Sequence, residues 1–168
     1  MGRSRDPFPD AGTGHGWEVT DHLAIYLNDH LMGATGGLEL FRRVAGNIPE
    51  VAPIVPEIEE EREHLLALLD AVGGTVDQAK VVAGWAGEKL GRLKLNGNLL
   101  RRSPLSDLIE LESLVVAVSG KRCLWRMLIA LDDPRLTRLD EMLAQAERQL
   151  EQLEQLRLQC GPKVLQTA

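Results

Sequence analysis

The sequence has 168 residues, 44% of them hydrophobic, which suits one domain large enough to bury a core. Its net charge of -6 and its 4% aromatic content argue against nucleic-acid binding, because that binding depends on neutralised phosphates and stacked bases. No apolar run approaches the roughly 18 residues of a membrane span and no signal peptide is apparent, so we expect no membrane partner and a cytoplasmic location, with reduced thiols at Cys123 and Cys160.

The chain begins with a stretch of proline, glycine and charged residues. Residues 1–16 show no periodicity and are predicted to form a disordered tail. Residues 17–161 carry apolar positions at helical spacing and are predicted to form a single bundle domain, with residues 162–168 as a C-terminal tail. Capping residues, glycines and prolines divide the domain into predicted helices over residues 20–46, 56–73, 75–94, 103–131 and 134–161.

The connections between these helices predict a topology. Tight turns near Gly46 and Asp132 make the helices on either side of each turn antiparallel. The long connection before Ser103 contains a helix of some 20 residues, which spans about 30 Å and can travel the length of a bundle. The helix from Ser103 is then parallel to the helix from Pro56, so the predicted fold is an all-α, ferritin-like four-helix bundle with a long helical crossover.

Polar residues interrupt the apolar stripe of residues 51–73. Glu61 and His64 lie on or beside its buried side, three residues apart. A carboxylate and an imidazole at that spacing are typical of a metal site in a helix bundle, and equally of a buried polar network.

Three further glutamates are predicted to lie at the same level as Glu61 along the long axis of the bundle. When residues are counted from the turns, Glu39, Glu112 and Glu154 fall within roughly one helical turn of it. Arg157 follows Glu154 at the same spacing as His64 follows Glu61.

This pattern resembles the ferritin-like di-iron carboxylate superfamily, in which two helices each give a Glu and two each give Glu-x-x-His. The resemblance implies that Glu39 and Glu112 match the single glutamates and that Glu61 with His64 matches one Glu-x-x-His. Glu154 would open the second motif, but Arg157 stands where its histidine should be, and a guanidinium cannot ligate a metal. The segments LNDHLMGATGGLELFRR and EKLGRLKLNGNLLRRSPLSDLIELESL are also similar to an uncharacterised bacterial group in that superfamily.

Two functions follow from this half-complete motif. The first is a non-enzymatic bundle without a cofactor, in which Arg157 points inward and pairs with Glu61, Glu112 and Glu154. The second is an iron- or manganese-dependent oxidoreductase whose site consists of Glu39, Glu61, His64 and Glu112.

Two surfaces suggest partners. The leucines that continue along residues 134–161, and the glycines Gly33, Gly36 and Gly37 that permit another helix to cross closely, predict a homodimer. A basic stretch is consistent with a solvated helix end or with an anionic partner, and it comprises Lys89, Arg92, Lys94, Arg101 and Arg102.

Overall fold

The computed structural model describes residues 19–77 and 103–166. In these residues it contains four long α-helices and one short 3-10 helix, so the all-α prediction is confirmed. The elements are α1 (Val19–Ala45), the 3-10 helix η1 (Pro49–Ile54), α2 (Val55–Ala71), α4 (Pro104–Leu131) and α5 (Leu139–Leu165). The predicted tail at 1–16, the predicted helix at 75–94 from residue 78 onward, and the basic stretch from Lys89 to Arg102 lie outside the described residues.

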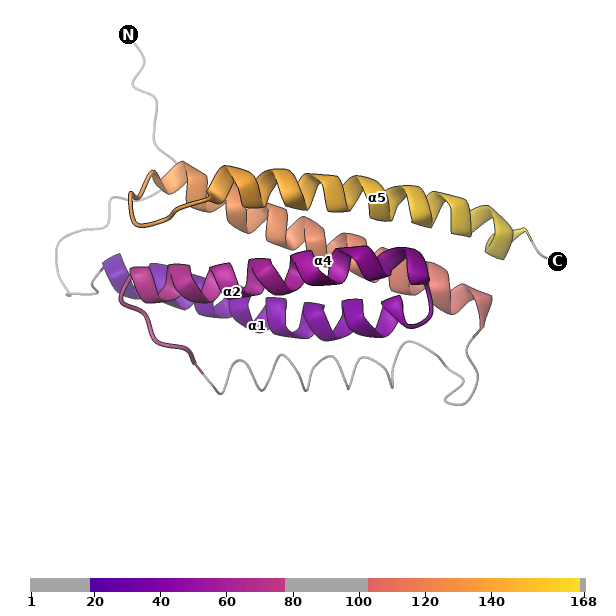
Figure 1. The fold of residues 1–168 in the computed structure, drawn as a ribbon, viewed down its shortest axis with the longest axis horizontal. Helices are drawn as coiled ribbons and strands as arrows, with labels where there is room; N and C mark the ends of the chain where they lie inside the picture. Colours follow the sequence, from indigo (N-terminus) through magenta and orange to yellow (C-terminus); the bar gives the residue numbers. More distant parts are fainter. Residues whose placement is uncertain (1–18, 78–102, 167–168) are drawn as a thin grey trace, which may run out of the picture.

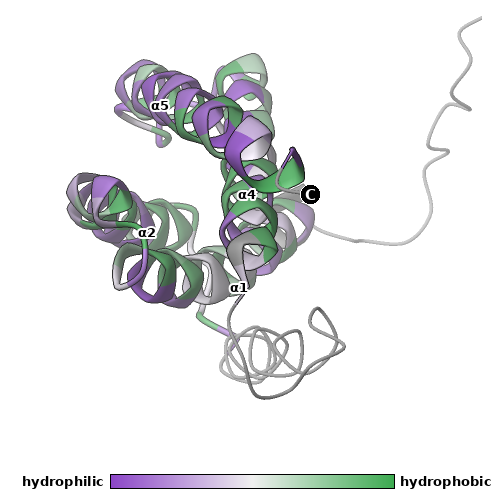
Figure 2. Cartoon of the chain, turned by 90° about the vertical axis from the view of Figure 1, so that its right-hand side faces the viewer, coloured by the Kyte–Doolittle hydropathy of each residue, from purple (hydrophilic) through white to green (hydrophobic). Residues whose placement is uncertain are grey.

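The four helices form two antiparallel pairs. In Figure 1, α1 and α5 run from left to right, whereas α2 and α4 run from right to left. The helices α2 and α4 are therefore parallel, as the predicted crossover requires. Figure 2 shows the helices in the order α2, α1, α4, α5 around the bundle, with apolar residues on their inner faces. None of the helices in the described ranges is long and apolar enough to cross a membrane.

The core consists mainly of leucines that repeat at helical spacing on each helix. Burying one such side chain contributes about 1.5–3 kcal/mol, so helix packing rather than local propensity holds the bundle together. Side chains with at most 1% exposure come from all four helices, and they include Leu27, Phe41, Leu69, Leu114, Trp125, Leu128, Met142 and Leu153.

Two predicted helix ends are confirmed by their local geometry. Gly73, just beyond the end of α2, has a φ of 78°, which glycine adopts without a steric cost. At the start of α4, the Ser103 backbone N–H donates to Ser106 Oγ at 3.2 Å, and Pro104 occupies the first turn.

The predicted start of the last helix at Asp132–Pro134 is wrong. Residues 132–138 form a loop, in which the Asp133 carboxylate accepts a hydrogen bond from the Arg135 backbone N–H at 3.0 Å. Asp132 and Arg138 both have positive φ values, 50° and 56°, so the chain turns sharply before α5 begins at Leu139.

The predicted end of that helix at Gly161 is also wrong, since α5 continues through Pro162 to Leu165. A proline removes the N–H that would bond to the carbonyl four residues earlier, here that of Leu158. Leu158 is 61% exposed and lies near the helix terminus, so water can satisfy its carbonyl group. Residues 162–165 are therefore helical and do not belong to a tail.

Candidate functional site

A polar cluster lies in the middle of the leucine core, on three helices. Glu61 of α2 is 2% exposed and Gln149 of α5 is 0% exposed. Lys121 of α4 reaches them, with its side chain 16% exposed. Each of these residues occupies a core position of its helix, three or four residues from buried apolar neighbours.

The cluster is closed by contacts between complementary groups. The Lys121 ammonium forms an ion pair with Glu61 Oε2 and donates a hydrogen bond to Gln149 Oε1. The Gln149 amide Nε2 donates to Glu61 Oε1 at 2.9 Å and to Glu57 Oε2 at 2.7 Å. One lysine, one glutamine and two carboxylates thus link α2, α4 and α5 across the core.

Burial moves the pKa values of the ion pair toward the neutral forms of both groups. The pKa of Glu61 is raised, chiefly because burial disfavours the carboxylate, while Lys121 and Gln149 oppose that effect. The pKa of Lys121 is lowered, again chiefly by burial, with Glu61 opposing it. With side chains 3% and 16% exposed, the pair is more deeply buried than the ion pairs of Arg42, Arg43, Arg135, Arg138 and Arg157.

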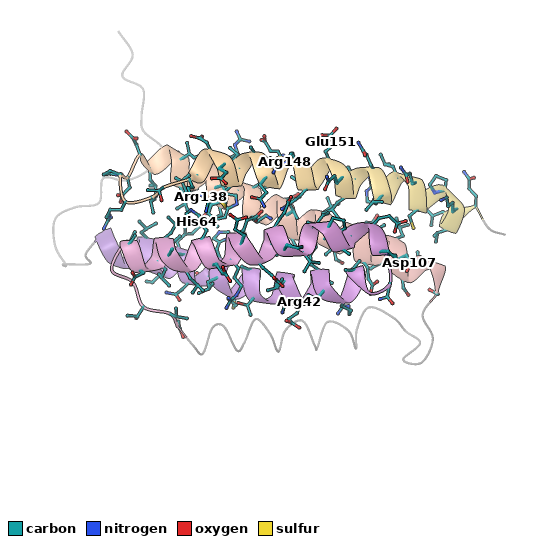
Figure 3. All side chains as sticks on the ribbon, viewed as in Figure 1. Arg42, His64, Asp107, Arg138, Arg148 and Glu151 are labelled. Atoms are coloured by element: carbon teal, nitrogen blue, oxygen red, sulfur yellow. The ribbon has the colours of Figure 1, made fainter. Side chains whose placement is uncertain are left out.

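Glu39 and His64, two of the predicted metal ligands, do not reach this cluster. Glu39 lies at the surface, where Arg42 joins it at 2.9 Å and joins Glu59 of α2 at 2.6 Å. His64 Nε2 is 2.9 Å from the carbonyl oxygen of Thr137, and because a carbonyl only accepts, Nε2 carries the proton. In Figure 3, His64 and Arg138 lie at the same end of the bundle, near the loop that leads into α5.

Glu112 and Glu154 come together, but at the rim of the bundle. Arg157 donates from Nη2 to Glu154 at 3.1 Å, and its Nη1 is 3.6 Å from Glu112. The predicted pairing of Arg157 with these two glutamates is confirmed. Its predicted pairing with Glu61 is wrong, because Lys121 takes that place and the glutamate side chains beside Arg157 are 45–46% exposed.

Lys121 and Gln149 are the functional candidates that the sequence analysis missed. The prediction for α4 required Glu112 to face inward, whereas the buried residues on either side of Lys121 are Val118 and Trp125. A polar residue between apolar core positions was the signal that identified Glu61. The same signal exists at Lys121 once the correct face of α4 is chosen.

The predicted ligands do not fit a metal ion in this arrangement. No group of three His, Cys, Asp or Glu side chains in the described ranges lies close enough to hold one. Glu61 faces an ammonium group, and a bound cation would have to displace it. The residues Glu39, His64, Glu112 and Glu154 each have other partners away from Glu61.

A cavity of about 490 Å³ lies between α1, α2 and α4, next to the polar cluster. Glu61 and Lys121 both line it, and Val116, which is 72% exposed, lies at its edge. Gly33 and Gly37 of α1 also line it, and a Cβ atom added to either would meet nothing within 4 Å. None of the helices in the described ranges makes the predicted close crossing at these two glycines.

Comparisons with family models, with curated proteins and with solved structures found no match to this chain. The functional assignment therefore depends on the site itself.

Proposed function

We propose that this chain is a non-enzymatic, ferritin-like helical bundle in which the ammonium group of a lysine side chain takes the place of a metal ion. The observation that carries the proposal is the contact of the Lys121 ammonium with Glu61, in the core between α2 and α4. A buried carboxylate needs a cation, and in this arrangement lysine supplies it within the chain. The parallel directions of α2 and α4, each with an antiparallel neighbour, support the ferritin-like topology.

Metal analysis of the purified protein tests the proposal. After expression in medium supplemented with iron and manganese, we expect the wild-type protein to contain no more of either metal than Glu61→Gln. That variant is the matched control, because it removes the buried carboxylate and keeps the shape of the side chain. Stoichiometric iron or manganese in the wild type, lost in Glu61→Gln, would contradict the proposal and favour a metal-dependent oxidoreductase.

We also propose that the chain forms a homodimer. Large apolar side chains near the end of α5 support this, since Leu158 is 61% exposed and Leu165 is 68% exposed. A stable dimer buries at least about 1,000 Å² in total. Sedimentation at micromolar concentration should therefore give twice the chain mass of 18.5 kDa, and a particle of the chain mass alone would contradict the dimer.

A further inference from the structure

The cavity beside the polar cluster has the volume and the mostly apolar wall of a small-molecule site. Its volume of about 490 Å³ falls within the roughly 300–1,000 Å³ that such sites occupy. Most residues around it are apolar, among them Phe41, Ile58, Leu65 and Leu124. Glycine inside a helix costs about 1 kcal/mol relative to alanine, yet among the described residues no atom lies within 4 Å of a Cβ placed on Gly33 or Gly37. The glycines therefore enlarge the cavity at the expense of helix stability.

The charged groups around the cavity favour an anion. Its titratable lining residues are Glu61, Lys121, Arg62 and His30. Glu61 and Lys121 offset each other, and burial lowers the pKa of His30, which favours the neutral imidazole. Arg62 remains, so the described residues of the wall carry one positive charge, on a chain whose net charge is -6. A positive apolar cavity in an acidic protein is complementary to an apolar molecule with one negative charge.

Two hydrogen-bond donors in the wall have capacity for a ligand. Arg62 donates from Nε to Thr35 Oγ1 at 3.2 Å and forms no ion pair with a carboxylate in the described residues. A guanidinium has five N–H donors in a fork that matches a carboxylate. Trp125 is 1% exposed, and its indole Nε1 has no acceptor in the same part of the chain. A buried donor without an acceptor is destabilising, and a ligand oxygen would remove that cost.

We infer that this cavity binds an amphipathic monocarboxylate, such as a medium-chain fatty acid. The carboxylate pairs with Arg62 and the hydrocarbon chain packs against the apolar wall beside Gly37. This inference goes beyond the proposed function and does not depend on the absence of a metal. Metal analysis tests the proposed function, whereas ligand titration tests the cavity, so failure of one is distinguishable from failure of the other.

The test is calorimetric titration of the full-length protein with laurate and with dodecanol, which has the same chain length but no charge. We expect one saturable site for laurate, with binding at least roughly tenfold tighter than that of dodecanol, because a charge-assisted bond to Arg62 is lost in the alcohol. Arg62→Gln should reduce the affinity for laurate to that for dodecanol. Gly37→Leu should abolish binding of both, because the leucine side chain would extend into the cavity from a position where an added Cβ meets no atom within 4 Å.

Control variants separate a filled cavity from a damaged fold. Ala67→Leu adds the same side chain on an exposed position of α2 away from the cavity, and should bind laurate as the wild type does. Gly37→Leu should remain folded in circular dichroism, because leucine is a better helix former than glycine. Absence of saturable laurate binding to the wild type overturns the inference, as does laurate binding that Gly37→Leu leaves unchanged. Conversion of a dimer to a monomer by Gly37→Leu, with unchanged laurate binding, would instead identify this face as a contact between two copies.

Discussion

The protein contains two carboxylate–cation clusters that use similar groups and differ in burial. In the core, Lys121 of α4 contacts Glu61 of α2 and Gln149 of α5. At the rim, Arg157 of α5 contacts Glu154 on its own helix and Glu112 of α4. The side chains of the core ion pair are 3% and 16% exposed, whereas those of the rim cluster are 28–46% exposed.

This difference in burial reverses the direction of the carboxylate pKa shifts. In the core, desolvation outweighs the ammonium and raises the pKa of Glu61. At the rim, the hydrogen bond from Arg157 outweighs desolvation and lowers the pKa of Glu154. The contribution of an ion pair to stability is therefore not constant, because it depends on how far the fold removes the two charged groups from water.

Arginines like Arg157 also connect the other neighbouring helices. Arg42 links α1 to α2 through Glu59, and Arg43 of α1 lies 3.6 Å from Glu110 of α4. Arg138, just before α5, contacts Glu60 of α2 at 2.8 Å. Arginine thus bridges each adjacent pair of helices at exposed or half-buried positions, while the core cluster uses lysine, whose compact ammonium reaches Glu61 from within α4.

The largest effect is expected from Lys121→Met, which keeps an unbranched side chain only one atom shorter and removes the charge. Glu61 then remains buried without a cation, so the free energy of unfolding should fall by about 3–5 kcal/mol at pH 7. Urea denaturation measures this change. The deficit should shrink at acidic pH, where Glu61 is protonated.

The double variant Lys121→Met/Glu61→Leu is the control for lost packing. Replacing both members of a buried pair by apolar residues is often neutral, so this variant should recover most of the lost stability. A double variant as unstable as Lys121→Met would show that packing, and not the unpaired charge, causes the loss.

Gln149→Leu should have the second largest effect. The Gln149 amide donates to both Glu57 and Glu61, and without it these buried or half-buried acceptors lose a donor. We expect a loss of about 1–3 kcal/mol in urea denaturation. Gln145→Leu is the matched control on the preceding turn of α5, because Gln145 is 6% exposed and no hydrogen bond of its side chain is observed in the described residues. Equal losses in the two variants would contradict a specific role for Gln149.

Much of the fold could be predicted from the sequence because local signals agreed with the helical period. Gly73 and the Ser103–Pro104 pair mark helix ends that the structure confirms. The segment from Asp132 to Arg138 was not predictable in the same way. It depends on two residues other than glycine with positive φ, and on the contact between Asp133 and Arg135, which no spacing rule indicates.

The candidate site was only partly predictable, for a reason specific to α4. Apolar residues occur on more than one side of this helix, and some of them, such as Val116 and Met127, are 72% and 52% exposed. For such a helix the sequence does not identify the buried face, because the apolar residues do not form a single stripe at helical spacing. Glu112 was therefore assigned to the core in place of Lys121. On α2 the stripe is cleaner, and Glu61 was identified correctly as a polar residue on the buried side.

A smaller effect is expected from Arg157→Leu. If Arg157 were the cation of the core, its loss would destabilise the fold as strongly as Lys121→Met does. Because the pairs of Arg157 are partly exposed and screened by solvent, the change in the free energy of unfolding should be small beside that of Lys121→Met. Urea denaturation of Arg157→Leu and Lys121→Met under the same conditions measures the two losses in the free energy of unfolding. Equal losses of stability in the two variants would contradict the conclusion that the buried cluster depends on its cation more strongly than the rim cluster does.

The smallest effect is the pH dependence of the two glutamates, and its sign differs between them. The native pKa of Glu61 is raised above 4.5, so the native state holds its proton more tightly, and this contribution to stability is lost as the pH rises through the raised pKa. The native pKa of Glu154 is lowered below 4.5, so its contribution is present above that pH and is lost as the pH falls through the lowered pKa.

Urea denaturation between about pH 3 and pH 7 should separate these contributions, because each variant removes one titrating group. Relative to the wild type, Glu61→Gln should lose less stability as the pH rises above 4.5, since a glutamine does not ionise in the core. Glu154→Gln should lose less stability as the pH falls below 4.5, since Arg157 no longer has a charged partner on its own helix to lose. If both variants changed the pH profile in the same direction, the two clusters would not differ in desolvation, because burial is what gives the Glu61 carboxylate the opposite pKa shift.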